Sequence, residues 1–267
     1  MRHKYANIRQ TYRFGRGFTL IELLVVIAII ALLMAMIMPA LDGARRLAKR
    51  MVCQGNLRQI AFGWKLYVDD WERFCQRTNA NHDFGGWKGL GPGLKLNRPL
   101  NKYVGLSPEI KTAKGAKLFH CLADTGGVLG YLPQDLAINI YGNSYQTNLF
   151  LVGPTSYPPP ASNLVALHTA INKRLINRIN LTDVTTNPSL LALVGDNNWV
   201  SEWLPDRPHR RAWHGKPQHH DLAFLDGHVD YIKIRKGLYV TSEYSILPFR
   251  DLHKMALAVQ QEVDPNS

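Results

Sequence analysis

The chain has 267 residues, which is enough for one large domain or two smaller ones with a buried core. Hydrophobic residues make up 46% and charged residues 19% of it, a composition that excludes intrinsically disordered and collagen-like proteins. The net charge of +12 would favour a nucleic-acid partner, but five basic residues and no acidic ones lie in residues 1–17, so we expect no nucleic-acid binding. A basic loop at residues 207–211 is interpreted as solvent-exposed, with a DNA contact as the alternative.

Residues 18–38 are apolar apart from Thr19 and Glu22. As a helix they would be about 30 Å long, which matches the hydrocarbon core of a bilayer. A cleaved secretory signal normally has an apolar region of about 7–15 residues that ends in small residues, whereas this run ends at Met38-Pro39. We therefore predict a transmembrane helix. A carboxylate inside it costs on the order of 2–3 kcal/mol, so Glu22 needs a partner.

The segment from Gly17 to Glu22 reads Gly-Phe-Thr-Leu-Ile-Glu, after a basic leader and before an apolar run that reaches Pro39. It resembles the processing site of type IV prepilins and of type II secretion pseudopilins. The resemblance implies that a prepilin peptidase removes the leader, residues 1–17, and methylates the new N-terminus at Phe18. It also implies that Glu22 pairs with the N-terminal amine of a neighbouring subunit during assembly. Pro39 is expected to kink the helix.

The distribution of positive charge does not orient this helix, because five basic residues precede it and five follow within 20 residues. The resemblance implies a single-pass protein of the inner membrane, with its leader in the cytoplasm and the rest in the periplasm or outside the cell. It also implies three kinds of protein partner: the peptidase, other pilin-like subunits and a secretion or pilus assembly platform.

Apolar residues recur at helical spacing through residues 39–74, opposite a basic and polar face. Together with residues 18–38 they predict one helix about 80 Å long. The aromatic stripe of Trp64, Tyr67 and Trp71 is interpreted as core packing. The resemblance implies a pilin-like lollipop, in which this helix packs on a mixed head.

The head is expected to span residues 75–267 and to have an α+β fold with a small antiparallel sheet. Its first part, residues 75–135, is rich in glycine and leaves room only for short strands. The prolines of residues 153–160 indicate an extended loop. A short helix over residues 168–180 and a buried strand over residues 190–194, ending at Gly195-Asp196, follow.

A β-hairpin is predicted near residues 222–234, with Asp226 and Gly227 as the two central residues of a primed turn. In that register Phe224 lies opposite Val229, and Leu222 lies opposite Tyr231. All four side chains then share one face of the hairpin.

The hairpin also resembles the C-terminal signature of a pseudopilin-like family, which is a histidine, nine residues and then Asp-Gly. His214 and the pair Asp226-Gly227 provide these residues, and His-Val follows them, as is usual in that family. Eleven residues separate His214 from Asp226 here, so we expect an insertion of two residues near residues 218–220.

Five histidines and four aspartates gather between residues 196 and 228, which suggests a metal site with Asp196, His214 and Asp226 as candidate ligands. Their spacing is not diagnostic, and the sequence contains no HExxH, P-loop or dinucleotide-binding motif. We therefore expect no catalytic residues and no bound cofactor. If an ion binds, the resemblance to pseudopilins favours calcium.

Three cysteines are too few for a disulfide-built scaffold, but they can oxidise outside the inner membrane. On a continuous helix Cys53 and Cys75 would lie about 33 Å apart and could not pair. A disulfide from one of them to Cys121 and three buried thiols remain as alternatives.

The sequence thus predicts a structural subunit of a type II secretion pseudopilus or a type IV pilus-like filament, not an enzyme. One alternative is a monomeric membrane-anchored module whose head binds a glycan, a metal or a protein. The other is a metal-dependent enzyme that uses the histidine-rich loop.

Overall fold

The fold is described from a computed structural model, which places residues 18–75, 82–91, 97–128, 131–153, 159–176, 179–204 and 212–263. The chain divides into two compact units, Met1–Arg45 and Arg46–Ser267. We call the second unit the head. The predicted leader, residues 1–17, lies outside the described residues.

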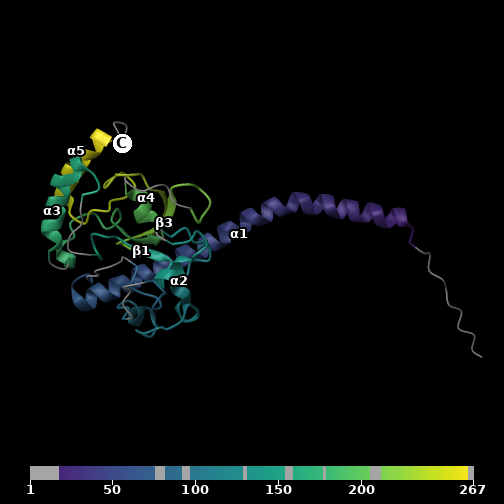
Figure 1. The fold of residues 1–267 in the computed structure, drawn as a ribbon, viewed down its shortest axis with the longest axis horizontal. Coiled ribbons are helices and arrows are strands. Elements are labelled where there is room, and N and C mark those ends of the chain that lie inside the picture. Colours follow the sequence, from purple (N-terminus) through teal and green to yellow (C-terminus); the bar gives the residue numbers. More distant parts are fainter. Residues whose placement is uncertain are drawn as a thin grey trace, which may run out of the picture. The chain divides into compact units, whose positions relative to one another are not determined.

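One long helix, α1 (Leu20–Trp71), begins in the first unit and continues into the head (Figure 1). Its apolar side chains in the first unit are exposed; Leu20, for example, is 79% exposed and Met36 68%. By length and composition this helix could cross a membrane, and none of its most apolar stretch is buried. The predicted long apolar N-terminal helix is confirmed, and Pro39 lies inside it.

The helix ends at Trp71, slightly before the predicted end near residue 74. The next residue, Glu72, has a φ of 56°, in the left-handed region that commonly ends helices. Phe74 therefore leaves the helix, and its ring packs 5.8 Å from that of Trp64. The end of α1 thus contributes to the core of the head.

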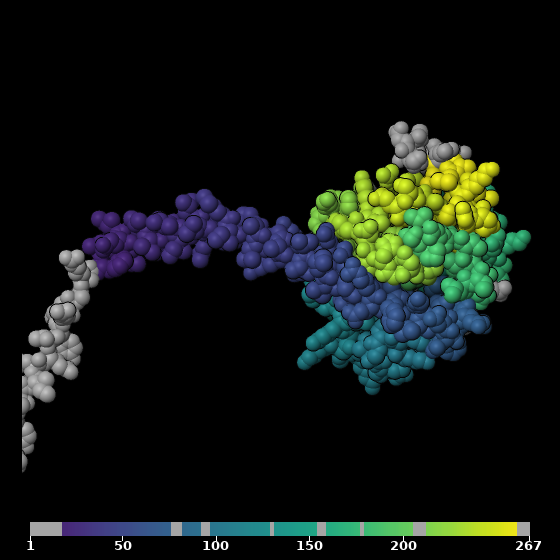
Figure 2. Space-filling model, turned by 180° about the vertical axis from the view of Figure 1, so that it is seen from behind, coloured from purple at the N-terminus to yellow at the C-terminus, as the bar shows by residue number. Residues whose placement is uncertain are grey.

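Within the head α1 buries one face, and Trp64 is at the centre of an aromatic cluster. Its ring lies 5.5 Å from that of Tyr67 and 5.6 Å from that of Phe84. Trp71 was predicted to belong to the same buried stripe, but it is 53% exposed, and its indole N–H donates to the Tyr103 hydroxyl at 2.8 Å. Figure 2 shows this part of α1, in blue, between teal segments that follow it in the sequence and light-green segments of the C-terminal half.

The head contains a four-stranded antiparallel sheet in the order β1-β2-β3-β4. The strands are β1 (Tyr145–Thr147), β2 (Ala192–Asp196), β3 (His219–Phe224) and β4 (Val229–Lys233). Every residue of β1 and β2 is buried, so this side of the sheet lies in the core. The α+β class with a small antiparallel sheet is therefore confirmed.

Shorter helices complete the head. The α-helices are α2 (Ala137–Tyr141), α3 (Val165–Leu175), α4 (Trp199–Trp203) and α5 (His253–Val263). The 3₁₀ helices are Asn101–Val104, Ala113–Phe119, Ser162–Leu164, Leu181–Asp183 and Arg250–Leu252. Figure 1 shows α3 and α5 side by side, and Arg174 of α3 forms a 2.5 Å ion pair with Asp251 just before α5.

Two elements have bounds that differ from the predictions. The helix expected over residues 168–180 is α3, which begins three residues earlier, at Val165, and ends five residues earlier, at Leu175. Ile179 instead accepts a hydrogen bond from the Phe74 N–H at 2.8 Å. The strand expected over residues 190–194 is β2, which begins two residues later and includes Gly195 and Asp196. Of the predicted proline-rich loop, residues 154–158 lie outside the described residues.

The predicted hairpin is formed by β3 and β4, but its turn differs. The Gly227 N–H donates to the Phe224 carbonyl oxygen at 2.9 Å, and Gly227 has a φ of 97°. Leu225 and Asp226 are therefore the central residues of the turn, and Gly227 is the left-handed residue that follows them. This is the geometry of a three-residue hairpin loop, in which only glycine takes the third position without strain.

The longer loop shifts the pairing by one residue against the prediction: Val229 pairs with Ala223 instead of Phe224, and Tyr231 pairs with Asp221 instead of Leu222. Because successive side chains in a strand point to opposite faces, a slip of one residue changes which side chains share a face. Asp221 thus lies on the same face as Tyr231, where a leucine was expected.

A disulfide joins Cys53 of α1 to Cys121, one of the pairings that the sequence left open. The two residues are 68 positions apart in the chain, and their Cα atoms lie 5.2 Å apart. Both are fully buried, and Cys75 is also buried but lies outside this disulfide. The bond therefore ties the helix covalently to the middle of the head.

We predict that replacing Cys53 and Cys121 together by serine lowers the free energy of unfolding of the head by about 4 kcal/mol, because the disulfide closes a 68-residue separation in the unfolded chain. The measurement is denaturant unfolding of the full chain in detergent, with and without a reductant. Cys75→Ser is the control and should respond to the reductant as the wild type does. Equal midpoints for the oxidised and reduced wild type would contradict the prediction.

Candidate functional site

Thr19 and Glu22 close the N-terminal end of α1. The backbone N–H and the hydroxyl of Thr19 each donate to Glu22 Oε2 at 2.8 Å. The Glu22 N–H donates back to Thr19 Oγ1 at 3.2 Å. This reciprocal pair is a capping box, which satisfies N–H groups that the first turn of a helix leaves unpaired. In the single chain the carboxylate therefore has hydrogen-bond partners from its own helix end.

The residues around the predicted cleavage point lie just before this cap. Phe18 is 72% exposed, and α1 begins two residues later, at Leu20. Gly17, on the other side of the predicted cut, lies outside the described residues. The predicted new N-terminus, Phe18, thus lies one residue before Thr19 and four residues before Glu22, the two residues of the cap.

A second group of polar side chains is buried in the head. Asp196 is the last residue of β2, Asp221 lies in β3, and His214 comes from the loop before β3. His214 Nε2 lies 3.3 Å from Asp221 Oδ2 and 3.6 Å from Asp196 Oδ2, and each side chain is at most 1% exposed. We call these three residues the buried cluster. An imidazole and two carboxylates are ligand types of divalent metal ions.

Neighbouring side chains hold the carboxylates of the buried cluster in place. Gln54 of α1 donates through Nε2 to Asp221 Oδ1 at 2.7 Å. His220 Nδ1 forms a 2.5 Å hydrogen bond with Asp196 Oδ1, and the Asp221 N–H donates to Asp196 Oδ2 at 3.2 Å. Asp221 Oδ2 and His214 Nδ1, in contrast, are buried without a hydrogen-bond partner among the described residues.

Arg50 is the basic side chain whose charge acts on the buried cluster. Its guanidinium carbon lies 4.5 Å from the centre of the Tyr231 ring, a cation–π contact. The Tyr231 hydroxyl in turn donates to the backbone oxygen of His214 at 3.1 Å. Among the described residues Arg50 forms no ion pair with Asp196 or Asp221.

Burial dominates the electrostatics of the cluster. Burial, reinforced by the charge of Asp196, raises the pKa of the Asp221 carboxyl to about 7. Burial also lowers the pKa of His214, although the Asp196 charge acts in the opposite direction. Burial therefore favours the uncharged forms of the Asp221 carboxyl and the His214 imidazole.

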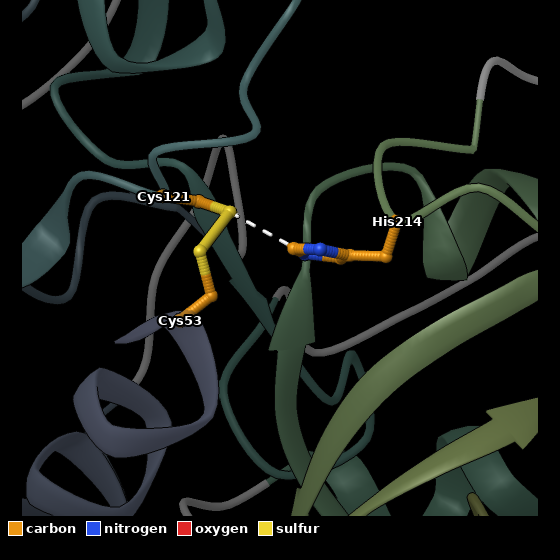
Figure 3. A group of neighbouring side chains, drawn as sticks. All are labelled: Cys53, Cys121 and His214. Carbon is orange, nitrogen blue, oxygen red and sulfur yellow. Dashed lines mark hydrogen bonds between the residues drawn. A yellow bond between two sulfur atoms is a disulfide. The ribbon is translucent and has the colours of Figure 1, made fainter. Parts of the chain in front are cut away.

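The buried cluster lies against the disulfide. Figure 3 shows the His214 ring directed at the Cys53–Cys121 bond, with its Nε2 atom 3.4 Å from Cys121 Sγ. The same nitrogen thus faces one sulfur and two carboxylates. Helix α1, the segment around residue 121 and the loop before β3 meet at this point.

The predicted C-terminal residues do not all belong to the cluster. His214 and Asp196 do, but Asp226 lies in the turn between β3 and β4, where its Oδ1 forms a 2.6 Å hydrogen bond with His228 Nδ1. The expectation that His214 and Asp226 act together as ligands is therefore corrected: Asp221 occupies the place beside His214. Gly227 has the turn role described above. Asp206 and His209 lie outside the described residues.

The residues that the sequence did not assign to this site are Asp221, Gln54 and the two disulfide cysteines. Asp221 was missed because the predicted hairpin register placed it away from Tyr231. A three-residue hairpin loop, with Gly227 as its left-handed third residue, would have placed it correctly. Gln54 follows Cys53 directly on α1, and no sequence pattern connects it to β3.

Comparison with known proteins gives one match. The family model described as the prokaryotic N-terminal methylation motif matches residues 13–38, which include the predicted cleavage point, the capping box and the whole apolar run. No curated protein and no solved structure matches the chain. The match covers the N-terminal segment and none of the head.

We predict that, with a chelator present, Asp221→Asn stabilises the head relative to the wild type at pH 8 by about 1–3 kcal/mol, and not at pH 4. The folded-state pKa of Asp221 is raised to about 7, so folding favours its protonated form. The contribution of this carboxyl to the free energy of unfolding is therefore complete below its ordinary pKa and is lost as the pH rises through 7. The substitution keeps an oxygen for Gln54 and removes the charge.

The measurement is denaturant unfolding of the full chain in detergent between pH 4 and pH 8. Taking the difference between variant and wild type removes the contributions of other titrating groups, including His82, whose pKa burial lowers to about 3. A difference that does not change with pH would contradict the prediction.

Proposed function

We propose that this prepilin-type chain is a pilin-like subunit that assembles into a filament. The filament is a type II secretion pseudopilus or a type IV pilus-like fibre. In this proposal the role of the chain is structural, and the head catalyses no reaction. The single observation that carries the proposal is the methylation motif at residues 13–38 at the start of an exposed apolar helix.

The exposed apolar surface of α1 supports assembly. The large apolar side chains from Leu20 to Met38 are more than 40% exposed, and in water such a surface would be strongly unfavourable. A bilayer can cover it before assembly, and the helices of neighbouring subunits can cover it afterwards. A prepilin peptidase would remove the leader and with it the basic residues that precede α1. The helix could then leave the membrane.

Glu22 supports a specific contact between subunits. In the single chain its carboxylate accepts hydrogen bonds from Thr19 but meets no positive charge within the described residues. Cleavage before Phe18 creates a new amine. A carboxylate in a low-dielectric environment is stabilised when a cation meets it, so pairing with the amine of a neighbouring subunit would offset its burial.

The disulfide supports the proposed orientation. Disulfides persist outside the cytoplasm and are rare within it, so the Cys53–Cys121 bond favours a head in the periplasm or outside the cell. The distribution of basic residues did not distinguish the two orientations. The leader would then lie on the cytoplasmic side of the inner membrane.

We predict that Glu22→Gln reduces assembly at least tenfold, whereas Thr19→Ala leaves it nearly unchanged. Glutamine can still form the capping box but has no charge, so this variant tests charge pairing separately from helix capping. Thr19→Ala removes a cap worth about 1 kcal/mol and keeps the carboxylate. Asp42→Asn removes an exposed carboxylate elsewhere on α1 and is the matched control.

The measurement is crosslinking in the native membrane, with a photo-crosslinking residue in place of Ile29, which is 53% exposed. The wild type and the Asp42 and Thr19 variants should give ladders of chain multiples, and Glu22→Gln should give monomers. Ladders of equal strength in all variants would refute charge pairing. Monomers in all of them, including the wild type, would favour a membrane-anchored binding module instead.

A further inference from the structure

We propose that the buried cluster of Asp196, His214 and Asp221 binds one divalent ion of the zinc class. The ligand atoms would be His214 Nε2 and one oxygen of each carboxylate. This site is independent of the filament proposal, because all three residues and their neighbours belong to the head.

The spacing of the ligand atoms fits such an ion. His214 Nε2 is 3.3 Å from Asp221 Oδ2 and 3.6 Å from Asp196 Oδ2. Two ligands bound tetrahedrally at zinc distances of about 2.0–2.2 Å lie about 3.3–3.6 Å from each other. All three ligand atoms lie within 4.8 Å of one another, so a single ion can reach them with small adjustments.

A hydrogen atom on His214 Nε2 would not form good hydrogen bonds with the two carboxylates. If His214 Nε2 carries a hydrogen, it faces Asp221 Oδ2, Asp196 Oδ2 and Cys121 Sγ at 3.3, 3.6 and 3.4 Å, and both oxygens lie beyond ordinary hydrogen-bond distance. Asp221 Oδ2 is fully buried and has no hydrogen-bond partner among the described residues. An unpaired buried carboxylate oxygen directed at an imidazole is the arrangement that a cation would complete.

The surrounding contacts are those of a metal site. The oxygen of each carboxylate that does not lead toward His214 is held by a neighbour, Asp221 Oδ1 by Gln54 and Asp196 Oδ1 by His220. Such outer contacts orient metal ligands. Of the two facing oxygens, Asp221 Oδ2 has no hydrogen-bond partner among the described residues, and Asp196 Oδ2 accepts the Asp221 N–H at 3.2 Å. Arg50, the basic side chain whose charge acts here, stacks on Tyr231 and forms no ion pair with the two carboxylates in the described part of the chain.

The donor set favours zinc over the calcium that the sequence suggested. Calcium takes six to eight oxygen ligands, whereas this cluster offers one imidazole nitrogen and two carboxylates in a fully buried place. Imidazole and carboxylate ligands in a three-residue set suit zinc, with a fourth position for water. The disulfide sulfurs are not ligands in this proposal, because they are already bonded to each other.

The test uses the full chain without a histidine tag, purified in detergent with its disulfide verified by mass spectrometry, stripped with a chelator and dialysed. Zinc or calcium is then added, excess ion is removed by gel filtration, and bound metal is counted by plasma mass spectrometry. Unfolding midpoints are measured in parallel. Asp221→Asn tests the site, and Asp226→Asn, which alters an exposed aspartate–histidine pair, is the matched control.

We expect about one zinc and no calcium per chain for the wild type and for Asp226→Asn, and at least a tenfold lower zinc content for Asp221→Asn. Zinc should raise the unfolding midpoint of the wild type above that of Asp221→Asn, and the chelator should reverse this order. Wild-type protein without bound zinc, or zinc bound equally by Asp221→Asn, would overturn the proposal. Zinc bound only after reduction would also overturn it, since Cys53 and Cys121 would then be the ligands.

Discussion

The first half of α1 exposes a continuous apolar surface that no described part of the chain covers. Such a surface must be covered by lipid or by other helices, because its exposure to water would cost more free energy than a typical domain gains by folding. This constraint links the sequence of residues 18–38 to a membrane and to partners of the same kind. In the proposed filament it would also act on Glu22, because a positive charge stabilises a carboxylate in a low-dielectric environment.

The head depends on a different point, where α1, the segment around Cys121 and the loop before β3 meet. The disulfide joins the first two covalently, and His214 packs against it from the third. Gln54, next to Cys53 on the helix, reaches Asp221 in the sheet. The buried cluster therefore connects the helix to the sheet beside the disulfide. A substitution in the cluster would alter the packing around the disulfide, and loss of the disulfide would alter the packing around the cluster.

The sequence predicted the long helix, the α+β class and the hairpin, because periodicity and turn residues are local signals. The prediction was wrong where a single residue sets the register of the hairpin. Gly227 follows the turn instead of lying at its centre, and the strand pairing shifts by one residue, so that Asp221 lies opposite Tyr231. The partner of Cys53 could not be chosen either, since the 68 residues up to Cys121 contain few regular elements. Contacts between distant segments, such as that of Gln54 with Asp221, leave no local pattern.

Processing before Phe18 distinguishes an assembling subunit from a simple membrane anchor. It can be measured by mass spectrometry of the N-terminal peptide of the protein isolated from its native membrane. We expect a chain that begins at Phe18 with one added methyl group on its amine. A chain that retains the residues before Phe18 would contradict it, and the helix would then be a simple anchor.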